Sequence, residues 1–282
     1  MRSVAALALT ATALVGCSRA PPPSGAAAHR VVSLGPATTE ALFAIGAGDR
    51  VVGRSHYCDY PPEATRLPDV GGMQPDVEAI LALHPDLVVG PSGGWSSRIA
   101  ETLQARGVAA WFPAEITSLA GVDGELLALG ERTGHGADAR ALVARLDARE
   151  GEVERAVAVT SPPRALLVVA LAPVVVAGPG TFAHDLLRRA GAANVVAGNV
   201  PWPHVGFEQI AELDPDVIVD VSVVESGGAT RITMDAPGWG GLRAVREGRV
   251  LPVADERVLR PGPRVAEGLA VLARALHPAE VR

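Results

Sequence analysis

The chain has 282 residues, 48% of which are hydrophobic, and its formal net charge is −6 at pH 7. Because a domain usually contains about 100 to 200 residues, this length can form one large core or two medium-sized lobes. The charge balance leaves no basic excess to neutralise phosphates, and no cluster of Lys and Arg with interleaved aromatic residues occurs in the sequence. We therefore expect no nucleic acid partner.

The first residues have the composition of an export signal. Arg2 supplies a positive charge, an apolar run extends from Val4 to Val15, and Cys17 follows a small residue. The apolar run is too short to cross a bilayer as a stable helix. The sequence around Cys17 resembles the lipobox of bacterial lipoproteins, in which cleavage leaves an acylated cysteine; an ordinary signal peptide with an incidental cysteine is the alternative. We expect residues 1–16 to be removed and Cys17 to be lipidated.

A tether and one remaining thiol follow from this interpretation. Residues 17–29 contain three consecutive prolines and a run of alanines, which predicts a flexible link between the membrane and the folded protein. If Cys17 is acylated, Cys58 is the only thiol left, so no internal disulfide can form. Cys58 is then expected to be buried or to lie beside a pocket.

An internal repeat organises the folded part of the chain. Residues 76–90 read DVEAILALHPDLVVG and residues 206–220 read GFEQIAELDPDVIVD, and the two segments align without a gap. Each segment predicts a short helix that ends at the proline and a buried strand that follows it. The repeat therefore predicts two α/β lobes, residues 30–118 and residues 162–282, with helices covering parallel sheets.

A second, weaker pair of segments supports the same plan. The segments that begin at Ser33 and Ala177 each follow an apolar strand and place a helix before a Gly-Ala turn, so that Gly46 corresponds to Gly191. Residues 119–161, which lie between the lobes, are rich in helix-forming residues and predict a long connecting helix. Glycines at positions 130, 134 and 136 could instead divide it into two. A helical connector would keep the lobes at a nearly fixed separation, so large hinge closure is not expected.

Three strings point to a known family. HYCDYPPEA at 56–64, the following VEAILALHPDLVV, and PWPHVGFEQI at 201–210 resemble the cobalamin-binding branch of the helix-connected, class III periplasmic binding proteins. That class serves ABC importers of cobalamin, haem and iron-siderophores, and the resemblance covers about residues 30–280. It implies an α/β fold with two Rossmann-like lobes, each with a parallel central sheet, joined by a long connecting helix.

The resemblance also implies a function. The chain would be a substrate-binding lipoprotein of the periplasm or cell envelope that captures cobalamin or a related corrinoid and delivers it to the permease dimer of an ABC transporter. It would not be an enzyme, would need no cofactor besides its corrinoid ligand, would be a monomer, and would meet the membrane only through its lipid anchor. A haem or ferric-siderophore receptor on the same fold is the alternative.

Aromatic residues in loops are the candidate ligand contacts. The resemblance assigns Tyr57 and Trp202 to the corrinoid cleft, whereas a further family tryptophan falls at Pro91, which leaves Trp95 four positions out of register. Tyr60 also lies beside prolines in a loop. Large flat ligands are gripped by rigid aromatic faces at low entropic cost. The alternative for each ring, and for Tyr60 above all, is that it caps a lobe's core.

The histidines do not form a metal-binding pattern. No two of them have ligand spacing on one helix, and no carboxylate cluster accompanies them, which disfavours a receptor for a bare metal ion. His204 lies two residues after Trp202 and is a weaker candidate for a contact with the ligand. The site is therefore expected to contain no protein-bound metal.

Two glutamates occupy matching places in the repeat. Glu78 and Glu208 each fall in the first turn of a predicted helix, where a carboxylate offsets the helix dipole. A pseudo-twofold protein could also present such a pair to a twofold-symmetric permease. The family resemblance supports docking of these carboxylates against permease arginines.

Two further motifs favour other functions. Gly178, Gly180 and Ala183 match a dinucleotide-binding fingerprint, but no carboxylate follows at the distance that would hold a ribose, so a nucleotide-cofactor enzyme is a distant alternative. An anionic siderophore would need converging cations. The arginines that could supply them are Arg231, Arg257, Arg260 and Arg264.

Overall fold

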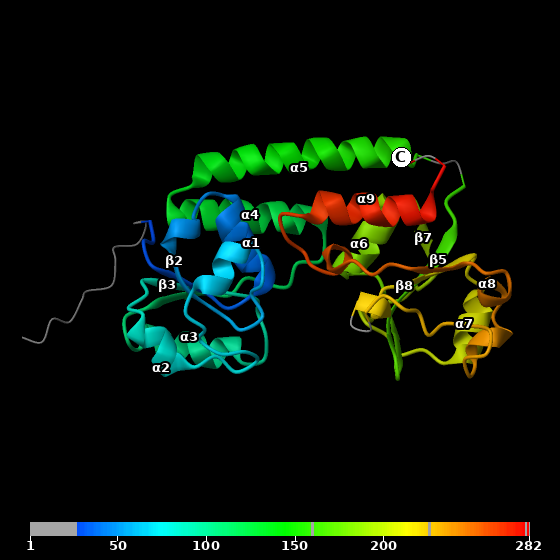
Figure 1. Ribbon diagram of the computed structural model, residues 1–282, viewed down its shortest axis with the longest axis horizontal. Helices are drawn as coiled ribbons and strands as arrows, with labels where there is room; N and C mark the ends of the chain where they lie inside the picture. The colour runs from blue at the N-terminus through cyan, green and yellow to red at the C-terminus, as the bar shows by residue number, and fades with distance from the viewer. Residues whose placement is uncertain (1–26, 159–160, 225–226, 280, 282) are drawn as a thin grey trace, which may run out of the picture.

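The computed structural model describes residues 27–158, 161–224, 227–279 and 281, so the predicted signal segment and Cys17 lie outside the described residues. Figure 1 shows two lobes side by side, with helices along one long side of the molecule. No helix within the described ranges is both long enough and apolar enough to cross a membrane.

The N-terminal lobe contains a four-stranded parallel sheet in the order β2-β1-β3-β4. Its central strands are short buried runs of valine and leucine, with Ser33 at the end of β1, as expected for a sheet covered on both faces. In chain order the elements are β1 (Val31–Ser33), α1 (Pro36–Ala44), β2 (Val51–Arg54), α2 (Val77–Ala82), β3 (Leu87–Val89), α3 (Ser96–Gln104) and β4 (Ala109–Trp111).

The C-terminal lobe contains a five-stranded sheet in the order β6-β5-β8-β9, with β7 paired to β5. In chain order the elements are β5 (Arg164–Leu171), β6 (Val174–Val176), α6 (Phe182–Arg189), β7 (Ala193–Asn194), α7 (Phe207–Leu213), β8 (Val217–Asp220), α8 (Arg243–Arg246), β9 (Val250–Pro252) and α9 (Val265–Leu276). The sheet differs from the parallel expectation at β6, which is antiparallel to β5 because only two residues separate the strands.

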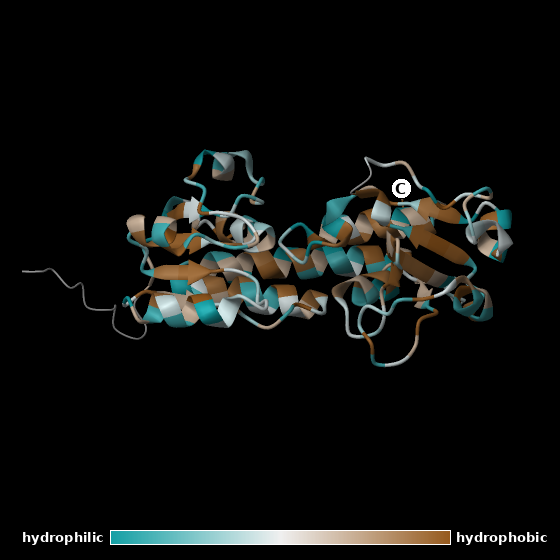
Figure 2. Cartoon of the chain, turned by 90° about the horizontal axis from the view of Figure 1, so that it is seen from below, coloured by the Kyte–Doolittle hydropathy of each residue, from teal (hydrophilic) through white to brown (hydrophobic). Residues whose placement is uncertain are grey.

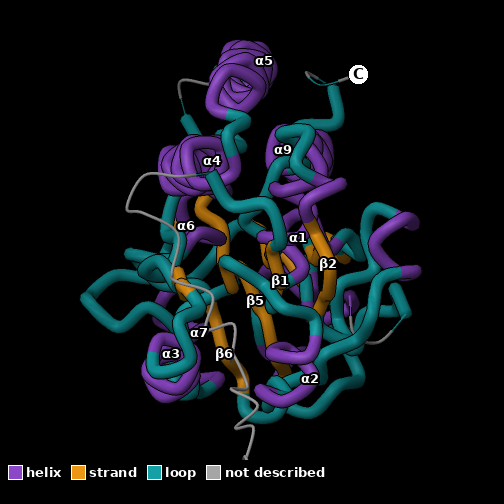
Figure 3. The backbone as a smooth tube through the Cα atoms, turned by 90° about the vertical axis from the view of Figure 1, so that its left-hand side faces the viewer, coloured by secondary structure: helices purple, strands orange, loops and turns teal. Residues whose placement is uncertain are grey.

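The connector consists of two helices, α4 (Leu119–Thr133) and α5 (Gly136–Ala156). The break falls at Gly134, which ends α4 with φ 77°, a conformation that favours glycine. At its start, α4 is tied to the C-terminal lobe, where the backbone N–H of Leu119 donates to Asp185 of α6 at 3.0 Å. At its end it meets the N-terminal lobe, where Ala28 N–H donates to the Arg132 carbonyl. The longer helix α5 then leads back, and Figure 3 shows α4, α5 and α9 gathered on one side of the molecule.

The repeat predicted from the sequence is present in both lobes, as α2 with β3 and as α7 with β8. The structure extends the correspondence to an arginine at the start of each lobe's first strand, Arg30 just before β1 and Arg164 as the first residue of β5. The Asp86 carboxylate accepts the backbone N–H of Arg30, and the Asp216 carboxylate accepts that of Arg164, both at 3.0 Å. Each arginine also donates from Nη2 to a carbonyl at the end of the repeat helix, at 2.7 Å in both lobes.

The two lobes share part of one apolar core. The largest buried cluster contains residues of β1 and α1 in the first lobe, of α4 in the connector, and of α6 and α9 in the second. Each lobe has a separate cluster on the other face of its sheet. Figure 2 shows the strands as the most hydrophobic parts of the chain, enclosed by helices with mixed surfaces. The shared core holds the lobes together through packed side chains as well as through the chain connection.

Candidate ligand-binding cleft

A cavity of about 230 Å³ lies where the lobes and the connector meet. It is lined by residues of the first lobe, of α4 and of the second lobe. The described residues of the lining are Ala37, Thr38, Pro91, Ser92, Pro113, Ala114, Glu115, Ile116, Glu125, Phe182, Ala183, Trp202, Leu259 and Pro261. Binding of a ligand here would involve both lobes at once.

Trp202 is the one sequence-predicted ligand contact among these lining residues. Its segment is fixed to β6 and the turn that follows, because Val176 N–H donates to the Pro203 carbonyl at 3.2 Å and Gly178 N–H donates to the Pro201 carbonyl at 2.7 Å. A Cβ at Gly178 would lie 2.4 Å from the Val200 carbonyl oxygen, so only glycine allows this approach. The first glycine of the fingerprint-like motif therefore serves to hold the Trp202 segment against β6.

The two tyrosines lie in the loop that follows β2, outside the lining of this cavity. Tyr57 is 51% exposed, and its ring lies against the backbone of Gly72, where a Cβ would be 3.2 Å from Cε2. Tyr60 is 43% exposed, and the Arg264 guanidinium stacks on its ring at 4.2 Å. The tyrosine rings are thus exposed aromatic surfaces with one face supported.

Trp95 and His204 are also outside the lining. Trp95 precedes α3, and its half-buried ring packs edge to face on Phe112 at 5.5 Å within the first lobe. His204 is exposed and forms an isolated antiparallel bridge with Val175. Among the residues that the structure describes, no group of three His, Cys, Asp or Glu side chains could hold a metal ion.

Cys58 is fully buried, which is one of the two environments expected for it from the sequence. Its Sγ accepts from the Thr39 hydroxyl at 3.0 Å and lies 3.2 Å from Ser55 Oγ. The thiol therefore fills a polar pocket under the loop that carries the tyrosines.

Two carboxyl groups in the cavity lining were not foreseen from the sequence. Glu125, on α4, accepts a hydrogen bond from Thr38 Oγ1 at 3.1 Å, and burial raises the pKa of its carboxyl group while that hydrogen bond lowers it. Glu115 lies in the exposed loop after β4. A charged residue within a helical sequence is typical of a solvent-facing position, so nothing in the local pattern marks Glu125 as a cavity residue.

Three of the four arginines considered for an anionic ligand are paired with carboxylates. Arg264 binds both oxygens of Glu40, with Nε and Nη2 each at 2.7 Å, and Arg260 binds Glu40 at 2.8 Å. Glu256 accepts from both arginines, at 2.7 and 2.9 Å. Arg257 binds Asp255 and Glu267, whereas Arg231 is exposed. The buried Glu40 thus joins α1 of the first lobe to the segment before α9.

Glu78 and Glu208 lie in the first turns of α2 and α7, as the repeat predicts. Both are exposed, and neither side chain has a hydrogen bond or ion pair in the part of the chain that the structure describes. Helix α2 is capped by Asp76, whose side chain accepts the N–H groups of Glu78 and Ala79. In Figure 1 the two helices lie in different lobes on the side of the molecule away from α5.

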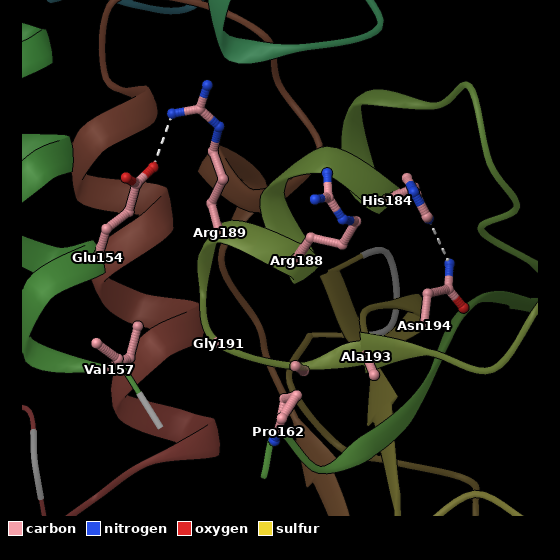
Figure 4. Close-up of a pocket in the computed structure, with 11 residues that line it drawn as sticks. Glu154, Val157, Pro162, His184, Arg188, Arg189, Gly191, Ala193 and Asn194 are labelled. Carbon is pink, nitrogen blue, oxygen red and sulfur yellow. Dashed lines mark hydrogen bonds and ion pairs between the residues drawn. The ribbon is translucent and has the colours of Figure 1, made fainter. Parts of the chain in front are cut away.

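A larger cavity of about 640 Å³ lies on the outer side of the second lobe, between the end of α5, α6 and β7. Figure 4 shows that four of its polar side chains bind one another in two pairs. Arg189 donates to Glu154 at 2.7 Å, and Asn194 Nδ2 lies 3.0 Å from His184 Nδ1. Because these groups are satisfied within the protein and the cavity contacts only one lobe and the connector, the cavity between the lobes is the better candidate site.

Two α/β lobes that share helices and enclose a cavity between them define a two-lobed solute-binding protein. The chain belongs to the periplasmic binding protein family, whose sequence profile matches residues 31–255. This family is a class of binding proteins and supports a location in the periplasm or cell envelope.

Known proteins and solved structures are similar to this protein over most of its length. It is 31% identical over 255 residues to the vitamin B12-binding protein of Photorhabdus laumondii, with 89% of each chain covered. It is similar to the crystal structure of the periplasmic vitamin B12 binding protein BtuF of Vibrio cholerae, with a TM-score of 0.75, 25% identity, and coverage of 90% of this chain and 99% of that one. It is also similar to the periplasmic haem-binding protein RhuT of Roseiflexus sp. RS-1, with a TM-score of 0.77, 28% identity, and coverage of 89% and 99%.

Proposed function

We propose that this protein captures cobalamin or a related corrinoid in the cleft between its lobes and delivers it to the permease of an ABC importer, without catalysing a reaction. The observation that carries the proposal is Trp202, a 37% exposed ring that lines a cavity formed by both lobes. The similarity to vitamin B12-binding proteins supports the same ligand. A flat aromatic face held by backbone hydrogen bonds suits a large macrocycle.

The remaining aromatic candidates have supporting roles in this proposal. Tyr57 and Tyr60 offer exposed rings on the loop after β2, and a corrinoid much larger than the 230 Å³ cavity would extend beyond its lining. Trp95 and His204 are weaker proposals, because Trp95 is packed on Phe112 and His204 is bridged to β6.

The delivery step rests on Glu78 and Glu208. Their exposure, their matching places in the two lobes and their lack of partners among the described residues support docking against cations of a twofold-symmetric permease. The proposal also includes a monomeric receptor that is anchored to the membrane through an acylated Cys17. The assignment of this anchor rests on the sequence alone.

A haem or siderophore receptor remains the second candidate, because the haem-binding protein RhuT has the same fold at similar identity. The pairing of Arg257, Arg260 and Arg264 with carboxylates argues against it, since these arginines have little capacity left for an anionic ligand.

Calorimetric titration with cyanocobalamin tests the proposal. We expect the purified protein to bind with a dissociation constant below about 1 μM, which corresponds to about −8 kcal/mol. Trp202→Ala should weaken binding at least about tenfold, because a buried aromatic contact is lost. Val200→Ala is the matched control, since its side chain is exposed two residues away and outside the cavity lining, and it should bind as the wild type does.

Two results would contradict corrinoid binding or the role of Trp202. A folded protein that releases no heat with cyanocobalamin would refute the corrinoid proposal, and haem and ferric siderophores would then be titrated. Equal losses in Trp202→Ala and Val200→Ala would exclude Trp202 as a specific contact.

A further inference from the structure

The charged residues of the interlobe cavity all have one sign. Among its described lining residues, the titratable side chains are Glu115 and Glu125, and none is Lys, Arg or His. Glu125 is held by Thr38, which is itself buried, so its carboxyl group has a fixed position on the connector side of the cavity. The ionised group accepts a hydrogen bond from a carboxamide N–H and repels an anion, whereas the protonated group carries no charge and can donate its O–H to a carboxamide oxygen.

The nearest guanidinium groups do not offset this charge. Arg260 lies between the lining residues Leu259 and Pro261, and Arg264 follows Arg260 four residues later. Both bind Glu40, whose side chain is 1% exposed, and both bind Glu256. Arg260 also approaches Asp59 at 3.3 Å. Three carboxylates therefore surround two guanidinium groups, and the border of the cavity keeps a negative charge.

We propose that the cavity selects its ligand by charge: it admits neutral or cationic macrocycles rich in carboxamides and rejects close analogues that carry carboxylates. Glu115 and Glu125 are the residues that determine this specificity, and Glu40 prevents Arg260 and Arg264 from reversing it. This inference rests on the proposed function, because it specifies which members of the corrinoid and chelate classes the same cleft accepts. A like charge in a partly buried site is disfavoured more strongly than in open water.

A matched pair of ligands tests charge separately from shape. Cyanocobalamin is neutral, and its monocarboxylic acid has one side-chain carboxamide replaced by a carboxylate of nearly the same size. We expect the wild-type protein to bind the neutral form about tenfold more tightly, a difference of about 1.4 kcal/mol. The difference should shrink as ionic strength rises, because salt screens the repulsion.

Variants assign the discrimination to residues. Glu115→Gln and the double variant with Glu125→Gln should reduce the ratio of the two affinities towards one, whatever their affinity for neutral cyanocobalamin, and far-UV circular dichroism checks that the variants are folded. Glu101→Gln is the control, because Glu101 is exposed on α3 and outside the cavity lining, and it should keep the tenfold ratio.

The outcomes separate this inference from the proposed function. Equal wild-type affinity for the two corrinoids, or an unchanged ratio in the double variant, would overturn charge selection and leave corrinoid binding in place. Binding of haem without binding of either corrinoid would overturn both. If neither corrinoid nor haem binds, but cationic ferrioxamine B binds more tightly than its neutral N-acetyl derivative, the corrinoid proposal fails and charge selection stands.

Discussion

Two glycines that end helices show how one backbone conformation can meet different surroundings. Gly46 follows α1 and Gly191 follows α6, with φ values of 83° and 84°. A Cβ at Gly46 would meet the His135 ring at 3.6 Å and an Asp138 carboxylate oxygen at 4.0 Å, both ordinary contacts. A Cβ at Gly191 would lie 2.8 Å from His277 Nε2 and 3.0 Å from the Val157 carbonyl oxygen. The repeat therefore conserves the turn but not the space around it.

Alanine substitutions at these two sites should differ in cost. Both replacements force a residue with a side chain into the left-handed region, at about 1–2 kcal/mol. Gly191→Ala should lose about 1–3 kcal/mol more, because the new methyl group overpacks a partly buried site next to the backbone of Val157. Urea unfolding of both variants measures the free energies, and equal losses would contradict the contacts described at Gly191.

At the scale of elements, the junction of α4, α5 and α6 concentrates acidic groups. Glu150 of α5 is 4% exposed and faces Arg189 of α6 at 3.7 Å. Burial raises the pKa of its carboxyl group to about 7, and nearby Asp123, Asp147 and Glu154 add to the increase while Arg189 opposes it. Since the folded protein holds this proton more tightly than the unfolded chain, the stabilisation is complete below pH 4.5 and is lost as the pH rises through about 7.

Glu150→Gln should remove that pH dependence. As the pH rises from about 5 to about 8, the free energy of unfolding of the variant should increase by about 1–3 kcal/mol relative to that of the wild type. This follows from about 1.36 kcal/mol for each unit of difference between the folded and unfolded pKa values. Glu152→Gln is the control, because Glu152 is exposed on the same helix. A stability difference between Glu150→Gln and wild type that stays constant over this range would show that Glu150 does not titrate as described.

The elements differ in how far the sequence predicts them. Periodicity and the aligned prolines predict α2, β3, α7 and β8, because each buries a regular apolar pattern within one short segment. The antiparallel direction of β6 was not predicted, because its apolar run has the same pattern as a parallel strand. Trp202 was assigned to the cleft by the family resemblance of its segment, and its place in a loop rich in proline agrees with that assignment. Glu125 was missed because its role depends on contacts between distant segments.

At the scale of the whole molecule, several features link the lobes. Helices α4 and α5 both extend between them, one buried cluster contains residues of both, and Glu40 binds Arg260 and Arg264 over more than 200 residues of sequence. A large hinge rotation would separate packed apolar surfaces. It would also leave the buried Glu40 carboxylate without its arginine partners. The free protein should therefore have nearly its ligand-bound shape.

Distances between spin labels on the two lobes test this expectation. Labels at Ser97→Cys on α3 and Glu212→Cys on α7 occupy exposed positions, whereas the native Cys58 is buried. We expect cyanocobalamin to shift the distance distribution by less than about 5 Å, the rise of one helical turn. A larger shift would contradict the restraint by the connector and the shared core.

The most direct test of the central claim is a crystal structure of the protein with cyanocobalamin, measured at the cobalt absorption edge. We expect a single strong anomalous peak between the lobes, with the corrin ring near Trp202 and Glu125. A peak in the outer cavity beside His184 and Arg188, or none in crystals soaked to saturation, would contradict capture of a corrinoid in the interlobe cleft.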